Sequence, residues 1–179
     1  MSALKPMLTK PLIAFTTARF QCRDFVSDES AFAISIGIFE DQGEFEQVLQ
    51  WQAKRPRENF QLAIIESATA KLIGTAGVLM EGKGGGDAKL VLNLAQSTQG
   101  RYAVAFEIGY GVLNWAFDAL SLTQISVHIS ENQSTAQKLA RYAKFSHVDK
   151  DSESSMQIWH LSYGTWAEHT GKLWKNHGK

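Results

Sequence analysis

The sequence predicts an α/β fold in which hairpin-connected strands and one strand–helix–strand crossover belong to the same mixed sheet. The strand-like runs 60–66 (FQLAIIE) and 72–80 (LIGTAGVLM) are separated by a short turn and predict an antiparallel hairpin. A strand at 89–95, a helix at 103–120 and a strand at 124–130 follow, which is the order of a parallel crossover. The chain has 179 residues, enough for one domain with a buried core.

Each of these elements has its own local signal. The apolar residues of 60–66 are nearly continuous, which favours a buried strand, whereas apolar and polar residues alternate in 124–130. The helix at 103–120 carries a broad apolar stripe that would face the sheet. Gly109 and Gly111 lie inside it, and each costs about 1 kcal/mol against alanine but would permit close packing.

Weaker patterns place the other elements. They are strands at 20–25 and 156–163 and helices at 28–39, 43–54 and 132–143. Asn132, Ser134 and Thr135 are the candidate N-caps of the last of these helices. The tail after Trp166 is expected to be a short helix or loose.

Composition narrows the function classes. Lys and Arg number 18, as do Asp and Glu, so the formal net charge is zero and favours neither nucleic acid nor an anionic membrane as the partner. Cys22 is the single cysteine, which excludes an internal disulfide and any zinc site built on two thiolates, so no metal is expected. The first residues lack a long apolar run, and we expect no signal peptide, no membrane span and a cytoplasmic location.

The loop before the helix at 103–120 is the first candidate for chemistry. Residues 97–103 (STQGRYA) connect a strand to the helix, and backbone N–H groups at a helix N-terminus bind phosphate with help from the helix dipole. Arg101 would add a charge-assisted contact. The same pattern also occurs in plain connections, so this loop alone does not decide between the two.

Four segments in fixed order resemble proteins of the GNAT superfamily of N-acetyltransferases, in particular its Rim-type, ribosomal-protein-alanine acetyltransferase-like branch. Residues 17–23 (TARFQCR) are similar to the branch's T-x-R-L-x-L-R strand, and 72–77 completes a hairpin with its I-G-x-x-G signature. Residues 107–117 resemble E-A-x-x-x-L-L-x-W-A-F, and 132–145 resemble N-x-x-S-x-x-x-A-E-x-x-G-F. The resemblance covers about residues 10–165, within a single GNAT-like domain of 1–179.

The resemblance implies a mixed, mostly antiparallel seven-stranded sheet with flanking helices. Strands 89–95 and 124–130 would splay into a V that holds acetyl-CoA, and the acceptor amine, a protein N-terminus or a small amine, would enter from the opposite side. Attack on the thioester would be direct. The cofactor-binding residues implied are Leu92, Asn93 and Leu94 along the strand, Gln99, Gly100, Arg101, Tyr102, Ala103 and Val104 at the phosphates, and Asn132 and Lys138.

The sequence also departs from the family. A gapless count back from Glu107 places Gly100 where the Q/R-x-x-G-x-G/A loop begins and Ala103 where it has glycine, and a Cβ there hinders close approach of phosphate. Leu90 occupies the position where the family often has a glutamate base, and leucine cannot remove a proton.

The candidate catalytic residues therefore each carry an alternative. Asp87 would be the base, although it falls in a glycine-rich loop, and Tyr142 would protonate the leaving thiolate, although packing also explains it. Ser134 is either a catalytic hydroxyl or a cap. His128 on its alternating strand would serve as a base or simply occupy the polar face.

Two function hypotheses follow. The first is an acetyl-CoA-dependent N-acetyltransferase. The second is a catalytically degenerate GNAT-fold binding or interaction module, motivated by Leu90 and the altered loop. The identity of the acceptor and the oligomeric state, including a homodimer, remain open at this point.

Overall fold

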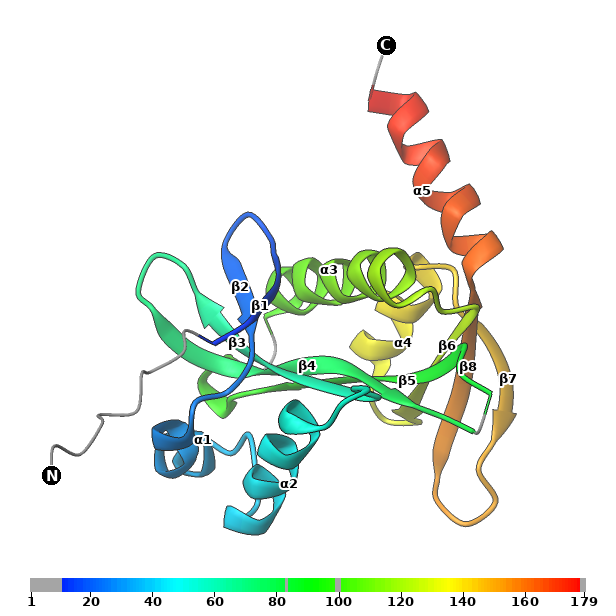
Figure 1. Ribbon diagram of the computed structural model, residues 1–179. Coiled ribbons are helices and arrows are strands. Elements are labelled where there is room, and N and C mark those ends of the chain that lie inside the picture. The colour runs from blue at the N-terminus through cyan, green and yellow to red at the C-terminus, as the bar shows by residue number, and fades with distance from the viewer. Residues whose placement is uncertain (1–10, 83, 99–100, 178–179) are drawn as a thin grey trace, which may run out of the picture.

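The computed structural model describes residues 11–82, 84–98 and 101–177 (Figure 1). Its strands form one eight-stranded sheet in the order β1-β2-β3-β4-β5-β6-β8-β7. The pair β5–β6 is parallel, and the other neighbouring pairs are antiparallel. The strands are β1 (Ile13–Thr16), β2 (Phe20–Arg23), β3 (Asn59–Glu66), β4 (Lys71–Met80), β5 (Asp87–Leu94), β6 (Gln124–Ser130), β7 (Ser146–Lys150) and β8 (Met156–Ser162).

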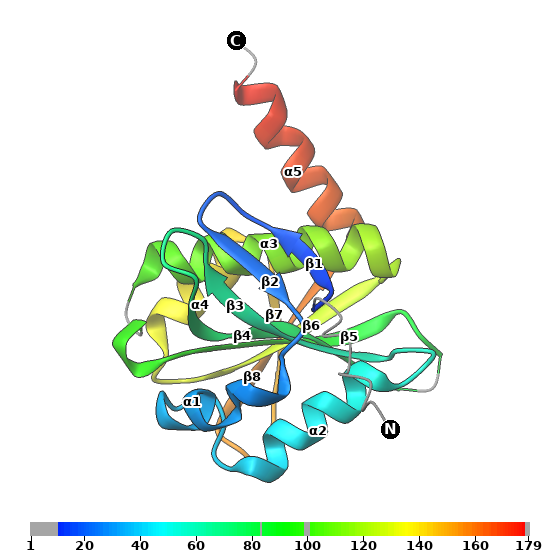
Figure 2. The ribbon, with the colours of Figure 1, turned by 60° about the vertical axis from the view of Figure 1, so that its left-hand side comes forward.

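Helices cover both faces of the sheet (Figures 1 and 2). One face carries α1 (Ser30–Ser35) and α2 (Gln42–Ala53), and the other carries α3 (Tyr102–Leu120) and α4 (Ser134–Tyr142). The last helix, α5 (Tyr163–His177), projects from the body of the molecule (Figure 1).

The two-sided cover explains why β3 reads as a continuous apolar run. Leu62 and Ile64 belong to the core under α3, whereas Ala63 and Ile65 belong to the core under α1 and α2. A strand between two layers of helix buries both faces, so apolar residues replace the usual alternation. The prediction of a buried strand is confirmed.

The mixed α/β fold expected from the sequence is confirmed, but the sheet has eight strands rather than seven. Strands β1 and β7 were not predicted from the sequence. The five residues of β7 are all exposed, so this edge strand has no buried face and no apolar alternation to reveal it. The tail after Trp166 belongs to α5, which is longer than the expected short helix.

Three boundaries also differ from the predictions. Helix α1 is short because the chain turns at Gly37, where φ is +77°. Helix α4 begins at Ser134 with Gln133 in the N-cap position, and no side chain caps it. The carboxamide oxygen of Asn132 instead accepts a hydrogen bond from Ser130 Oγ at 2.7 Å. Asp87 begins β5 rather than lying in the preceding glycine-rich loop.

Glu107 fastens α3 to the turn between β1 and β2. Its carboxylate accepts hydrogen bonds from Thr17 Oγ1 at 2.7 Å, from the Arg19 backbone N–H at 2.9 Å and from Arg19 Nε at 2.7 Å. Burial alone would raise the pKa of Glu107, but the hydrogen bonds and the Arg19 charge outweigh burial and lower the pKa. These contacts hold α3 at a defined position above the sheet.

Candidate functional site

The sheet opens between β5 and β6. These strands pair only at Asp87↔Gln124, Ala88↔Ile125 and Lys89↔Ser126. Beyond these pairs β5 continues along β4 as far as Leu94 and β6 continues along β8, without further pairing between the two described strands. The result is a V whose closed end spans these three pairs and whose arms separate after Lys89.

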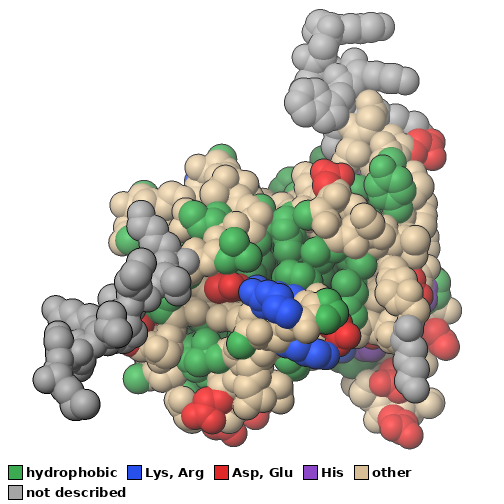
Figure 3. Space-filling view, in the orientation of Figure 1, with side chains coloured by type: hydrophobic (Ala, Val, Ile, Leu, Met, Phe, Trp, Pro, Cys, Tyr) green, Lys and Arg blue, Asp and Glu red, His purple; other side chains and the backbone are tan. Residues whose placement is uncertain are grey.

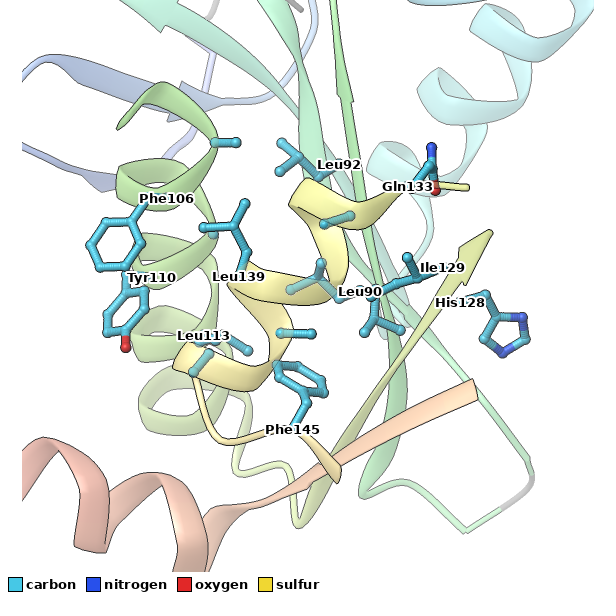
Figure 4. Close-up of a pocket in the computed structure, with 16 residues that line it drawn as sticks. Leu90, Leu92, Phe106, Tyr110, Leu113, His128, Ile129, Gln133, Leu139 and Phe145 are labelled. Atoms are coloured by element: carbon cyan, nitrogen blue, oxygen red, sulfur yellow. The ribbon is translucent and has the colours of Figure 1, made fainter. Parts of the chain in front are cut away.

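The first cavity at the V is the α3–α4 cleft, which has a volume of about 230 Å³ (Figure 4). Its walls come from α3, α4, β5 and β6, and they are mostly apolar. Figure 3 shows apolar side chains gathered near the centre of this view, over α3 and α4. The lining residues are Leu90, Leu92, Ala105, Phe106, Gly109, Tyr110, Leu113, Val127, His128, Ile129, Gln133, Ala136, Leu139, Ala140, Ala143 and Phe145.

The second cavity, the α1–α2 groove, lies on the opposite face of the sheet and has a volume of about 900 Å³. Residues between Gly37 and Trp51, from the α1–α2 connection and α2, form one wall, and residues of β3, β4, β5, β6 and β8 form the floor. The Asn93 side chain donates a hydrogen bond from Nδ2 to the Ile38 carbonyl at 2.9 Å, which ties the wall to the floor. The charged side chains of the groove include Glu40, Glu44 and Lys89.

The cleft and the groove meet at three residues, Leu90, Leu92 and His128, which line both cavities. We call these residues the junction. The two leucines point from β5 toward the helices, whereas His128 points from β6 away from α3 and α4 (Figure 4). Groups that enter from opposite faces of the sheet would therefore meet beside one imidazole.

The environment of His128 favours the neutral imidazole. Burial is the largest cause that lowers its pKa, and the positive charge of Lys89 lowers it further. Glu81 and Asp151 act in the opposite direction but do not reverse the shift, and His160 adds to the lowering. A neutral imidazole can accept a proton near neutral pH.

The three residues of β5 that were expected to bind the cofactor lie in different environments. Leu92 lines both cavities and Leu94 is buried in the core, whereas Asn93 lies on the groove side. The backbone of these residues forms the β5 side of the V.

The loop that the sequence analysis expected at the phosphates is described only in part. Gln99 and Gly100 lie outside the described residues. Arg101 occupies the N-cap position of α3, and its carbonyl accepts hydrogen bonds from the N–H groups of Val104 and Ala105. Arg101, Tyr102 and Ala103 are exposed, and Val104 is buried.

The residues expected around α4 do not line the cleft. Asn132, Ser134 and Lys138 are exposed and lie outside its lining, which α4 supplies through Ala136, Leu139 and Ala140. The spacing of Gln133, Ala136, Ala140 and Ala143 repeats at three and four residues, and this helical period was the signal that could have identified the lining face.

Two expected catalytic residues also lie away from the junction. Tyr142 is 47% exposed and packs against Phe106, with ring centroids 5.2 Å apart, on the outer side of α3. Asp87 lies at the closed end of the V, where its Oδ1 accepts a hydrogen bond from Thr123 Oγ1 at 3.3 Å. The structure instead places His128, from the alternating strand β6, at the junction.

A mixed sheet that opens between two parallel strands, with one cavity on each face, is the acyltransferase architecture that the sequence resemblance implied. The family model described as an acetyltransferase (GNAT) domain matches residues 17–146, so the chain belongs to the GNAT acetyltransferase family. No curated protein sequence matches the chain.

Solved structures agree on the fold. The spermidine N-acetyltransferase of Vibrio cholerae in complex with CoA and spermine is similar with a TM-score of 0.72 at 14% identity, covering 83% of this chain and 98% of that chain. An acetyltransferase of Agrobacterium tumefaciens is similar with a TM-score of 0.61 at 16% identity, covering 90% of this chain and 99% of that chain. Identities this low support the fold alone, and with spermidine acetyltransferases among the neighbours the Rim-type branch is not confirmed.

No helix in the described part of the chain is long and apolar enough to cross a membrane. Within the same part of the chain, no group of three or more His, Cys, Asp or Glu side chains is placed to hold a metal ion.

Proposed function

We propose that this protein is an acetyl-CoA-dependent N-acetyltransferase that moves an acetyl group to a primary amine by direct attack. The observation that carries the proposal is the pair of cavities on opposite faces of the sheet that meet at Leu90, Leu92 and His128. A direct transfer needs the thioester and the amine at one point, each with its own entrance. The junction supplies that point.

The donor would enter through the α3–α4 cleft. The pantetheine arm would pair with the backbone of Leu92, Asn93 and Leu94 on the β5 side of the V, since β6 does not pair with β5 there. The diphosphate would lie at the N-terminus of α3, a helix of 19 residues, near Gln99 to Val104. Arg101, Asn132 and Lys138, which are exposed, would contact the outer part of the cofactor.

The acceptor would enter through the α1–α2 groove, as a protein N-terminus or as a small amine. The spermidine acetyltransferases among the structural neighbours make polyamines reasonable members of the test panel. Glu40 and Glu44 in the groove would attract a cationic acceptor, and Lys89 beside the junction would disfavour the protonated amine at the reacting position.

The chemistry would proceed in one displacement. The amine nitrogen forms a bond to the thioester carbonyl carbon, the C–S bond breaks, and CoA leaves as the thiol after it gains a proton. His128 would accept the proton that the nitrogen loses, in the role that the sequence suggested for Asp87. Backbone N–H groups of the open β5 edge would stabilise the developing oxyanion.

The second candidate function is a GNAT-fold binding module without catalysis. It is favoured by the junction itself, because two of its three residues are leucines and Leu90 occupies the position of the family's frequent glutamate base. Such a module would still bind a CoA thioester but would not release the thiol.

One experiment separates these functions. Thermal unfolding is followed with CoA and acetyl-CoA, and thiol release is followed with spermidine, short peptides with free N-termini and small primary amines. A ligand at 100 times its Kd stabilises the folded state by about 2.7 kcal/mol, which corresponds to roughly 5–10 °C in Tm for a chain of this size. Stabilisation with thiol release supports the enzyme, and stabilisation without release from any amine supports the module. No stabilisation at millimolar acetyl-CoA refutes both.

A further inference from the structure

The side chain of Asn93 connects the floor of the α1–α2 groove to its wall. Leu92, the preceding residue of β5, points toward α3 and α4 (Figure 4), whereas Asn93 lines the groove and not the cleft. Asn93 Nδ2 donates a hydrogen bond to the Ile38 carbonyl at 2.9 Å and reaches the Gly37 carbonyl at 3.5 Å. One side chain of the sheet thus holds two successive carbonyl groups of the α1–α2 connection.

The turn at residues 37 and 38 is bound from two sides. The Gly37 N–H donates to the Ile34 carbonyl at 3.0 Å. The Ile38 N–H donates to the Ala33 carbonyl, also at 3.0 Å. Together with the φ of +77° at Gly37, these two bonds form a Schellman motif, which ends α1. The N–H groups of the turn therefore bind α1, and its carbonyl groups bind Asn93, which sets the distance of the turn from β5.

Two acidic residues of the groove follow this turn closely. Glu40 lies two residues after Ile38, a span of at most about 7 Å. The Glu40 N–H donates to Glu44 Oε2 at 2.8 Å, and the Glu44 N–H donates to Asp41 Oδ1 at 3.0 Å, so Glu40 is joined to the first turn of α2. We call Glu40 and Glu44, which both line the groove, the acidic wall. Its position depends on where the turn at Ile38 is held.

We propose that Asn93 is a positioning residue for the acceptor, because its hydrogen bond to Ile38 sets the distance between the acidic wall and the junction. The inference rests on the proposed function and extends it to a side chain that governs the acceptor but not the donor. An ammonium group of the acceptor would lie at the acidic wall while the reacting nitrogen lies at the junction. The Asn93 side chain would act through the wall and would not contact the reacting atoms.

Asn93→Leu removes the hydrogen-bond donor and keeps a side chain of similar size. Because Asn93 is exposed and the backbone of β5 remains in place, the variant should fold and bind acetyl-CoA within about twofold of the wild type. Its KM for diaminobutane should rise about 3–10-fold, the range expected for one net hydrogen bond. The rise should be smaller for butylamine, which has no second ammonium group to lie at the acidic wall.

Asn114→Leu is the matched control. It makes the same change at an exposed position of α3 that lines neither the cleft nor the groove. The KM values of both amines should therefore stay at the wild-type level, and so should the Kd of acetyl-CoA.

Amide hydrogen exchange provides a measurement that does not depend on activity. In Asn93→Leu, a peptide that covers residues 36–44 should exchange faster than in the wild type, whereas a peptide from α3 should be unchanged. Asn93→Asp, which keeps the shape of the side chain but cannot donate when ionised, should show the same faster exchange. This second variant tests the hydrogen bond even if Asn93→Leu does not fold.

The outcomes distinguish this inference from the proposed function. An unchanged KM for diaminobutane in folded Asn93→Leu overturns the inference, and so does unchanged exchange over residues 36–44. Equal rises in KM for the two amines contradict the role of the acidic wall, and an equal loss of acetyl-CoA affinity means that Asn93 supports the sheet as a whole. The proposed function fails in a different way, since the wild type itself would then release no thiol with any amine.

Discussion

Gly77 lies in β4 at a point where the backbone of β3 comes very close, and replacement of Gly77 by alanine tests this close approach. A Cβ at this position would lie 1.7 Å from the Phe60 carbonyl oxygen. Gly77 is paired on both sides, with Gln61 in β3 and Val91 in β5, so neither neighbouring strand can move without breaking its hydrogen bonds. The obstacle is backbone rather than a flexible side chain.

The expected cost follows from this geometry. Overpacking of a core by a methyl-sized group typically costs 1–3 kcal/mol when side chains can rearrange, and we expect Gly77→Ala to reach about 3 kcal/mol because the backbone must move. For a chain of this size that loss lowers the Tm by roughly 6–12 °C. Gly109→Ala is the matched control, since its Cβ meets open space and should raise stability by up to about 1 kcal/mol.

The assay is urea unfolding followed by tryptophan fluorescence and far-UV circular dichroism. Both variants should keep the wild-type dependence of the unfolding free energy on urea concentration, so that the midpoints report stability. A Gly77→Ala protein within 0.5 kcal/mol of the wild type, about the range of an ordinary surface substitution, would refute the reasoning about the close approach of β3 and β4.

Three further predictions concern single side chains. Arg57→Met should destabilise the fold by about 3–5 kcal/mol in urea unfolding, because the buried carboxylate of Asp24 loses its partner. In the wild type, Asp24 Oδ1 lies 2.8 Å from Arg57 Nη1. The control is Lys54→Met, which removes an exposed ion pair and should change stability by less than about 1 kcal/mol. If neutral His128 is the base, kcat/KM should fall as the pH drops through the lowered pKa of His128. Lys89→Met removes a positive charge that lowers this pKa, so the variant should have a higher pKa and the acidic limb of its pH profile should move to higher pH. An acidic limb at the same pH in both proteins would exclude His128 as the base. Burial raises the pKa of the Cys22 thiol to about 12, so a thiol reagent at pH 8 should label it only after unfolding, and labelling of the folded protein would contradict its burial.

The sequence predicted most of the layers because their apolar patterns are strong. The runs that became β3, β4 and β6 each bury at least one face, so local periodicity was sufficient. The edge strand β7 has no buried residue, and its pairing with β8 is a tertiary contact that composition does not encode.

The candidate site was less accessible to sequence reasoning. Alternation along β6 correctly separated His128 from Ile129, but which cavity each side chain faces depends on where β5 and β6 part. The phenol of Tyr142 made this residue a candidate acid, whereas the fold packs its ring against Phe106 of α3, away from the junction. Cavities arise from the packing of distant segments, so their lining could be read only in part from helical spacing.

The separate entrances to the junction have a kinetic consequence. Because the α3–α4 cleft and the α1–α2 groove open on opposite faces of the sheet, neither substrate would have to leave before the other arrives. An enzyme built this way follows a sequential rather than a ping-pong rate law, and its double-reciprocal plots intersect. Each product would also leave by its own portal, so CoA would compete with the thioester and not with the amine.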